Sequence, residues 1–225
     1  MPRRSYCQRR TFMASYNILL MRCKRSDPYY QAIRDRHYIP NNGAIGQQLH
    51  YLIYVDYEIA GIISGGSAAF ATKARDEFFG INKDNRTVAL NGIIDNTVFR
   101  LEKNLPNLGT QILAKWRKVV AQDWEAKYRI KPCGFETFII ENENRKGALY
   151  KADNWTFVGE TSGSTKMHLH GITNAFERQK NVKKLVFCKW IKGRELPLEY
   201  QSTWNSLVES RKPFMRAKNL QGALL

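Results

Sequence analysis

Residues 104–128, NLPNLGTQILAKWRKVVAQDWEAKY, contain the strongest helical pattern of the chain. Apolar side chains recur at helical spacing and leave the opposite face to charged and amide groups. The apolar positions are Ile112, Leu113, Trp116, Val119 and Val120. An expected strand at 97–101 runs into the loop that precedes this helix. This order predicts an amphipathic helix packed on one face of a sheet.

The loop that opens the helix, NLPNLGT at 104–110, is the clearest candidate for holding a phosphate. The first amides of a helix have no intrahelical acceptor and lie at the positive end of the helix dipole. Gly109 permits close backbone approach of a ligand there. A plain capped turn is at least as good an interpretation, because many strand–helix junctions look alike.

Short strands and a few helices surround this unit. The strands are expected at 15–22, 48–56, 58–63, 87–94, 97–101, 134–140, 155–159 and 183–191. Other helices are expected at 28–36 and, after a glycine turn in SGGS, up to about Phe79. The pattern predicts an α/β fold in which a mixed sheet carries helices on its faces. We expect a basic extension with the first strand at 1–26, a catalytic domain at 27–200 and a tail at 201–225.

Charge is concentrated at the two ends of the chain. The chain has 36 basic and 20 acidic residues, a net charge of +16, of which residues 1–26 carry +7 and residues 161–225 carry +8. Basic flanks around a nearly neutral centre suit a polyanion held beside a catalytic body. No window approaches 18 unbroken apolar residues, so no membrane span is expected. The four cysteines are widely spaced, which favours reduced thiols in a cytoplasmic protein.

The basic flanks provide the predicted nucleic-acid contacts. These are Arg3, Arg4, Arg9, Arg10, Lys166, His168, His170, Lys183 and Lys184. His168 and His170 would share one side of an extended segment. Such a pair can bind a metal, but we favour a basic surface.

Two further clusters are candidates for chemistry. His37 and Tyr38 follow the helix expected at 28–36, where a histidine can titrate near neutral pH or simply interact with the helix end. Glu136 lies in an otherwise apolar strand, where a carboxylate is costly unless it is paired or functional. Glu141 and Tyr150 follow it in an irregular stretch. A metal site and a salt bridge for Glu136 both stay open.

Several segments occur in an order that resembles one protein family. They include RDRHYIPNNGAIGQQLHYLIY at 34–54, NTVFRLEKNLPNLGTQIL at 96–113 and GALYKADNWTFVGETSG at 147–163. These motifs span about residues 28–165 and resemble the family of the phage Mu Mom protein and its relative in the Druantia anti-phage system. The resemblance implies a GNAT-like fold, with a central mixed sheet that is splayed and a donor held at a strand–helix junction.

The resemblance also implies an activity. Mom proteins convert adenine in phage DNA to a carbamoylmethyl derivative on its exocyclic amine, which protects the genome from restriction enzymes. The implied partners are double-stranded DNA and, for one donor, tRNA, in the cytoplasm of a host cell, with a homodimer left open. A non-enzymatic DNA-binding defence subunit and a GNAT enzyme acting on protein amines are the alternatives.

Two donors are compatible with that product. The carbamoylmethyl group is an isomer of a glycyl group, whereas an acetyl group lacks the nitrogen. Glycyl-tRNA would therefore bring every atom, and acetyl-CoA would need a separate nitrogen source. The implied donor site consists of Arg100, Asn104, Asn107, Leu108, Gly109 and Thr110. In it the chain departs from the superfamily pattern Arg/Gln-x-x-Gly-x-Gly/Ala, because Asn107 replaces the first glycine.

The resemblance also places the catalytic groups. His37 is expected to be a base or metal ligand, and Tyr38 a proton donor or base-stacking partner. Glu136 or Glu141, with Tyr150, would complete the site. An iron or zinc ion held by His37, Glu141 and Tyr150 is a further expectation.

Overall fold

The computed structural model describes residues 15–39, 46–161 and 182–197 of the chain. Within these ranges seven strands form one sheet in the order β1-β2-β3-β4-β5-β7-β6. The strands are β1 (Ile18–Cys23), β2 (Gln48–Val55), β3 (Glu58–Ser67), β4 (Ile93–Leu101), β5 (Gly134–Ile140), β6 (Thr156–Glu160) and β7 (Lys184–Trp190). The helices are α1 (Pro28–Arg34), α2 (Lys73–Phe79), α3 (Arg86–Ala89), the 3-10 turn η1 (Leu90–Gly92), α4 (Leu108–Tyr128) and α5 (Ala148–Ala152).

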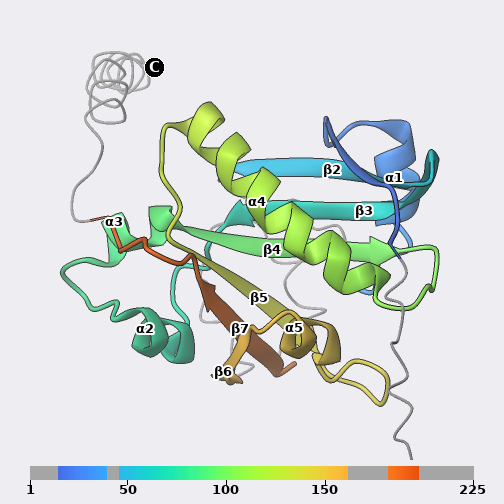
Figure 1. Cartoon of the computed structure of the whole chain (residues 1–225). Helices are drawn as coiled ribbons and strands as arrows, with labels where there is room; N and C mark the ends of the chain where they lie inside the picture. The colour runs from blue at the N-terminus through green and yellow to red at the C-terminus, as the bar shows by residue number, and fades with distance from the viewer. Residues whose placement is uncertain (1–14, 40–45, 162–181, 198–225) are drawn as a thin grey trace, which may run out of the picture.

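The sheet is mixed and splayed at its centre, as predicted. Strands β1 to β4 form an antiparallel meander, and β5, β7 and β6 form a second antiparallel set. The two sets meet where β4 and β5 run parallel, but these strands pair only over Ile93–Asp95 and Gly134–Glu136. Beyond those three pairs the strands diverge toward their carboxyl ends (Figure 1). The divergence leaves backbone and side chains of both strands available to a site between them.

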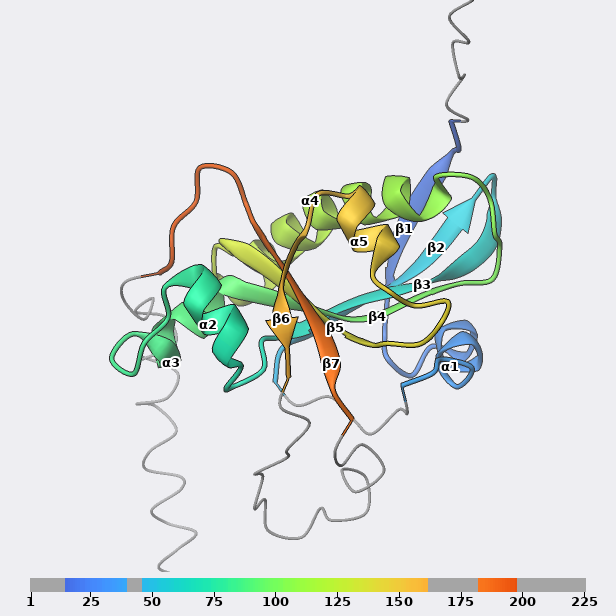
Figure 2. The same cartoon turned by 90° about the horizontal axis from the view of Figure 1, so that it is seen from below.

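Helices cover both faces of the sheet. Helices α4 and α5 lie on one side of it and α1 lies on the other (Figure 2). Trp116 and Val120 of α4 pack with Ile94 and Phe135 in the largest apolar cluster. On the other face, Phe79 of α2 packs with neighbouring strands in a second cluster. The predicted amphipathic helix is thus confirmed: Ile112, Leu113, Trp116 and Val120 are buried and Val119 is partly buried.

Helix α1 begins at a well-formed cap. The Asp27 carboxylate accepts hydrogen bonds from the amides of Tyr29 and Tyr30, and Pro28 occupies the first helical position. These interactions satisfy amides that would otherwise have no partner at the helix start. The cap determines where α1 begins and therefore where its end delivers His37.

Two expectations about secondary structure are wrong. The strand expected at 87–94 is helical up to Gly92, and β4 is one continuous strand. The Asn82 side chain accepts hydrogen bonds from the amides of Asp84 and Asn85, and this local turn starts α3 instead of a strand.

The SGGS stretch is the second difference, because it continues β3 rather than turning. A side chain at Gly65 would collide with Ile94 and Val120. The glycine therefore allows α4 to pack closely on the sheet.

Candidate active site

A cavity of about 200 Å³ lies at the splay between β4 and β5. It is lined from both faces of the sheet, because β4 and β5 no longer pair there. Its walls include His37 and Tyr38 after α1, Asn96 of β4, Thr137 of β5 and Tyr150 of α5. The structure thus brings together three of the predicted catalytic residues.

Tyr150 is a buried polar residue of this cavity. Its hydroxyl donates a 2.7 Å hydrogen bond to Oδ1 of Asn96 and lies 3.5 Å from Oγ1 of Thr137. Burial raises the pKa of the Tyr150 hydroxyl, so the group stays protonated at neutral pH. A protonated hydroxyl held inside a cleft can donate a hydrogen bond or a proton to a bound molecule.

The start of α5 holds Tyr150 in place. Gly147 has φ +75°, and a side chain there would meet the ring of Phe187 at 2.2 Å. Only glycine satisfies both conditions without strain. The Tyr150 ring stacks on Phe187 and meets Trp155 edge-on. The residue expected in an irregular stretch therefore belongs to a short helix anchored in the core.

The opposite wall consists of stacked side chains. The rings of His37 and Tyr38 lie 4.6 Å apart, and the Arg145 guanidinium lies 4.1 Å from the centre of the Tyr38 ring. Tyr38 keeps 37% of its surface exposed. This arrangement presents an aromatic and cationic surface at the mouth of the cavity, suited to a planar, electron-rich ligand.

His37 is neutral in this environment. Burial, together with the nearby Arg34, lowers the pKa of His37 to about 4. The Ile39 amide donates a hydrogen bond to Nδ1 at 3.2 Å. The Ile39 carbonyl lies 3.4 Å from the same nitrogen. Nε2 is a donor when Nδ1 accepts from the amide, and an acceptor when Nδ1 donates to the carbonyl. The role of His37 as a base stays a prediction.

The predicted donor loop lies at the start of α4. Asn107 has a left-handed backbone, with φ 57°, and its carbonyl accepts hydrogen bonds from the Gln111 amide and the Thr110 hydroxyl. The amides of Gly109 and Thr110 belong to the first turn, where helical amides lack intrahelical acceptors. Asn104 is exposed and Leu108 is buried.

Gly109 connects this loop to the cavity. A side chain at Gly109 would collide with Leu149, which lines the cavity beside Tyr150. The positive end of a 21-residue helix therefore lies next to the cavity.

Arg100 does not point to the α4 terminus. Its Nε donates a 2.6 Å hydrogen bond to Glu102, and Nη1 donates to the Arg36 carbonyl just before His37. Arg100 thus ties the end of β4 to the segment that carries His37 and Tyr38. These contacts hold that wall in place, and the predicted role of Arg100 in donor binding stays a prediction.

Glu136 forms the salt bridge that was one of its two predicted interpretations. Its Oε2 lies 2.6 Å from Nη1 of Arg75, and both side chains are completely buried. The Ala69 amide donates to the second oxygen at 2.7 Å. Burial raises the pKa of Glu136 to about 7, while Arg75 opposes this rise. Glu136 does not line the cavity of His37 and Tyr150.

A second carboxyl lies beside this ion pair. Asp95 is the register partner of Glu136, and its Oδ1 is buried without a hydrogen-bond partner. Burial and the neighbouring Glu136 raise the pKa of Asp95 well above its ordinary value of 3.8. At pH values between the ordinary and the raised pKa, the folded protein therefore keeps a proton on Asp95 that the unfolded chain releases.

We expect Asp95→Asn to stabilise the protein at neutral pH and to change little near pH 4. Between the unfolded and folded pKa values the folded state binds more protons, so the free energy of unfolding falls as pH rises. Asn has nearly the same shape as a protonated carboxyl but does not titrate. Thermal unfolding of both proteins from pH 4 to 8 measures this, and parallel curves would contradict it.

The predicted metal ligands do not come together. Glu141 is exposed after β5 and does not line the cavity that His37 and Tyr150 share. Across residues 15–39, 46–161 and 182–197, no group of three His, Cys, Asp or Glu side chains could hold a metal ion. In the same ranges, no helix combines the length and hydropathy that membrane crossing requires.

Most of the predicted nucleic-acid contacts lie outside the described residues. Those are Arg3, Arg4, Arg9, Arg10, Lys166, His168 and His170. Lys183 is exposed and lies 3.9 Å from Glu160, and Lys184 is half-buried in β7.

Three residues of the cavity were not singled out from the sequence. Asn96 and Thr137 are buried polar residues in strands, and Arg145 lies in the turn after β5. The only signal for Asn96 and Thr137 was a polar residue inside an apolar stretch. Their pairing with Tyr150 depends on the divergence of β4 and β5.

Comparisons with known proteins concern the family and the fold. A family model described as Druantia protein DruA matches residues 15–194, and no curated protein matches the chain. The structure of Arabidopsis thaliana NAA60 in complex with acetyl-CoA has a TM-score of 0.50 at 16% identity and covers 78% of this chain and 99% of that one. A GNAT family acetyltransferase from Elizabethkingia anophelis with acetyl-CoA bound has a TM-score of 0.46 at 12% identity, with the same coverage of 78% and 99%. These similarities concern the GNAT fold and not an activity.

Proposed function

Because the chain belongs to the family of the Druantia protein DruA, we propose that it is a transferase that moves an acyl-type group from an activated donor to an amine. We further propose that this amine is the exocyclic nitrogen of adenine in DNA. The product would protect or mark the DNA against cleavage, in line with the resemblance to Mom proteins.

One observation carries the proposal. A protonated, buried tyrosine hydroxyl and the positive end of α4 meet at a cavity that opens between two diverging parallel strands. A helix N-terminus favours a phosphate-bearing donor. In the proposed reaction this hydroxyl gives a proton to the leaving group. The cavity thus offers a candidate binding group for the donor, the start of α4, and a candidate proton donor for the leaving group, Tyr150.

The reaction needs few groups from the protein. The adenine nitrogen attacks the donor carbonyl, the bond from that carbon to the carrier sulfur or oxygen breaks, and a carbon–nitrogen bond forms. The direct product is an N-acyl adenine. With a glycyl donor, the carbamoylmethyl isomer then requires an intramolecular rearrangement in which the glycyl amine bonds to the ring carbon and the bond from that carbon to the original nitrogen breaks. The proton lost by the amine leaves to solvent, and Tyr150 supplies a proton to the departing carrier. In the tautomer with the proton on Nε2, His37 donates a hydrogen bond to the carbonyl oxygen as its charge develops.

The mouth of the cavity, near Tyr38, suits an adenine that has been extruded from the DNA duplex. An exocyclic amine inside a DNA duplex is out of reach, so the base must be extruded at a cost of a few kcal/mol. The exposed face of Tyr38, between His37 and Arg145, offers a surface on which a purine can stack. The cavity of about 200 Å³ limits what enters to the reacting groups.

The donor is either acetyl-CoA or glycyl-tRNA. The GNAT fold and the start of α4 support a coenzyme A thioester, because the pyrophosphate can meet the free amides there. The loss of the first loop glycine at Asn107 and the nitrogen in a carbamoylmethyl product support activated glycine. Either donor is compatible with the cavity, and we favour neither on geometry.

Nucleoside mass spectrometry tests the proposal. We expect DNA incubated with the purified protein and a labelled donor to contain a heavier deoxyadenosine that carries the label. Four reactions run in parallel: labelled acetyl-CoA with DNA, labelled glycyl-tRNA with DNA, and each of the two donors with a protein lysate.

Each outcome decides a different part of the proposal. Label in deoxyadenosine identifies the donor. Label only in protein shows that the acceptor is a protein amine, and that DNA modification is wrong. No label in any acceptor, with a folded protein that binds DNA, would show a binding subunit instead of a transferase.

A further inference from the structure

A second and larger cavity lies at the other end of the sheet. Its volume is about 960 Å³, near the upper end of the roughly 300–1,000 Å³ that ligand sites occupy. Its walls come from the carboxyl end of α4, the ends of β2 and β3, the α3 region and the segment after β7. None of the described residues that line it also lines the cavity of Tyr150.

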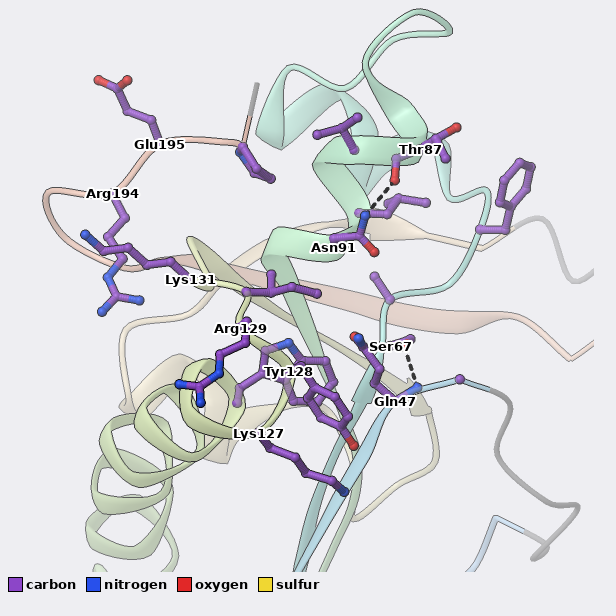
Figure 3. A pocket seen from close by; sticks show the side chains of 18 of the residues that line it. Gln47, Ser67, Thr87, Asn91, Lys127, Tyr128, Arg129, Lys131, Arg194 and Glu195 are labelled. Carbon is purple, nitrogen blue, oxygen red and sulfur yellow. Dashed lines mark hydrogen bonds between the residues drawn. The ribbon is translucent and has the colours of Figure 1, made fainter. Parts of the chain in front are cut away.

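The lining of this cavity is strongly cationic. Lys127, Arg129, Lys131 and Arg194 line it, against one acidic residue among its described lining, Glu195. Figure 3 shows Lys131, Arg129 and Arg194 gathered on one side, with Gln47 and Ser67 opposite.

Two of these cations have no partner. Within the described part of the chain, the side chains of Arg129 and Lys131 make no hydrogen bond or ion pair, and both residues are exposed. Lys127 and Arg194 have partners: Lys127 donates to the Gln48 carbonyl, and Arg194 donates to the Pro132 carbonyl and lies 3.8 Å from Glu125.

The dipole of α4 does not explain why these four cations lie around one cavity. Cations are stabilising near a helix carboxyl end, and Lys127 in the last turn of α4 meets that need. Lys131 comes after the helix has ended, and Arg194 comes from a segment more than 60 residues later in the chain. Bringing cations from separate segments to one cavity costs electrostatic repulsion, which an anionic ligand would relieve.

Aromatic surface accompanies the charge. Phe70 lines the cavity with 72% of its surface exposed, an unusual position for a large apolar side chain. Tyr128 lies on the same lining, with its hydroxyl bonded to Gln48. Aromatic faces beside cations are the combination that binds single-stranded nucleic acid, because bases stack while phosphates meet the charges.

We propose that this cavity binds a single-stranded segment of nucleic acid. Phosphates contact Lys127, Arg129, Lys131 and Arg194, and a base stacks on Phe70 or Tyr128. A volume of about 960 Å³ has room for a few nucleotides of one strand. The site lies apart from the transfer cavity and does not depend on the transfer reaction.

Binding of a fluorescent single-stranded 12-mer at several salt concentrations tests the charges. We expect the double variant Lys127→Gln, Lys131→Gln to bind more weakly and to lower the salt slope by about 1.4, since each phosphate contact contributes roughly 0.7 for a single strand. The control, Lys118→Gln with Lys151→Gln, removes the same charge from exposed sites that line neither cavity. It should leave the slope nearly unchanged.

Crosslinking tests the aromatic surface directly. A 12-mer with 5-iodouracil should form adducts at Phe70 or Tyr128 on irradiation, mapped by mass spectrometry of peptides. Phe70→Ala should weaken binding about tenfold, the size expected for one stacked base.

Three results would overturn the proposal: equal effects of the two double variants, adducts only at other residues, or a duplex that binds as tightly and with the same dependence on Lys127 and Lys131. Tyr150→Phe should bind the 12-mer like the wild type. If Tyr150→Phe loses transfer but still binds the 12-mer, the two sites are independent. If the wild type shows no transfer but binds the 12-mer through Lys127 and Lys131, the proposed function is wrong and this binding site remains.

Discussion

Tyr150→Phe should reduce the transfer rate by about 100-fold or more while the protein stays folded. General acid catalysis by one positioned group typically contributes 10²- to 10⁴-fold. Phenylalanine keeps the ring that packs on Phe187 and Trp155, so the substitution removes the hydroxyl alone. Loss of its hydrogen bond to Asn96 should destabilise the fold by about 1–3 kcal/mol.

Tyr51→Phe is the matched control for this variant. Tyr51 is also buried, and its hydroxyl donates a 2.8 Å hydrogen bond to Asp123, away from the cavity. It should lose comparable stability and keep the wild-type rate. The rate is measured as labelled deoxyadenosine formed per minute, and stability by urea unfolding. Equal rates for Tyr150→Phe and the wild type would show that the hydroxyl does not take part.

Arg75→Met should lower the free energy of unfolding by about 3–5 kcal/mol, the usual cost of removing one partner of a buried ion pair. Arg75 is completely buried and interacts with Glu136 at 2.6 Å and with Asp76 at 2.7 Å. It also donates to the Ala69 carbonyl. The substitution leaves the completely buried Glu136 without its cation, while Asp76 keeps Arg86 at 2.6 Å. Many domains have only 5–15 kcal/mol of stability, so this variant should be close to unfolding.

Lys73→Met is the control in the same helix. Lys73 forms an exposed pair with Glu77 at 3.8 Å, which is worth at most about 0.5 kcal/mol. Urea unfolding followed by tryptophan fluorescence compares the two variants. A change below about 1 kcal/mol for Arg75→Met would contradict the structural role of the ion pair.

Glu136→Gln then separates structure from catalysis. If Glu136 acts only through its ion pair with Arg75, the folded fraction of this variant should transfer at the wild-type rate. A loss of rate in fully folded protein would restore the expected catalytic role.

Local interactions made much of the fold predictable from the sequence. The period of apolar residues in α4 and the cap at Asp27 depend on neighbours within a few positions of the chain, and both elements lie where they were expected. Strand β5 also matches its predicted range, 134–140. The prediction failed at 87–92, where an asparagine turn outweighed β-branched residues.

The candidate site was only partly predictable. Its loop and the residues His37, Tyr38 and Tyr150 were found because they stand out in type or belong to a motif. Nothing local links Tyr150 with Asn96, which lies 54 positions away, or Glu136 with Arg75, which lies 61 positions away. Both contacts depend on which strands become neighbours and where they part.

The sequence by itself determined the helices that caps and periodicity define, the mixed class of the fold and the unequal distribution of charge. Only the tertiary structure decided which polar groups share the cleft between β4 and β5, and which cations meet at the far cavity. The reason is physical: caps and periodic faces act over a few residues, whereas a cavity forms where distant segments pack without filling the space between them.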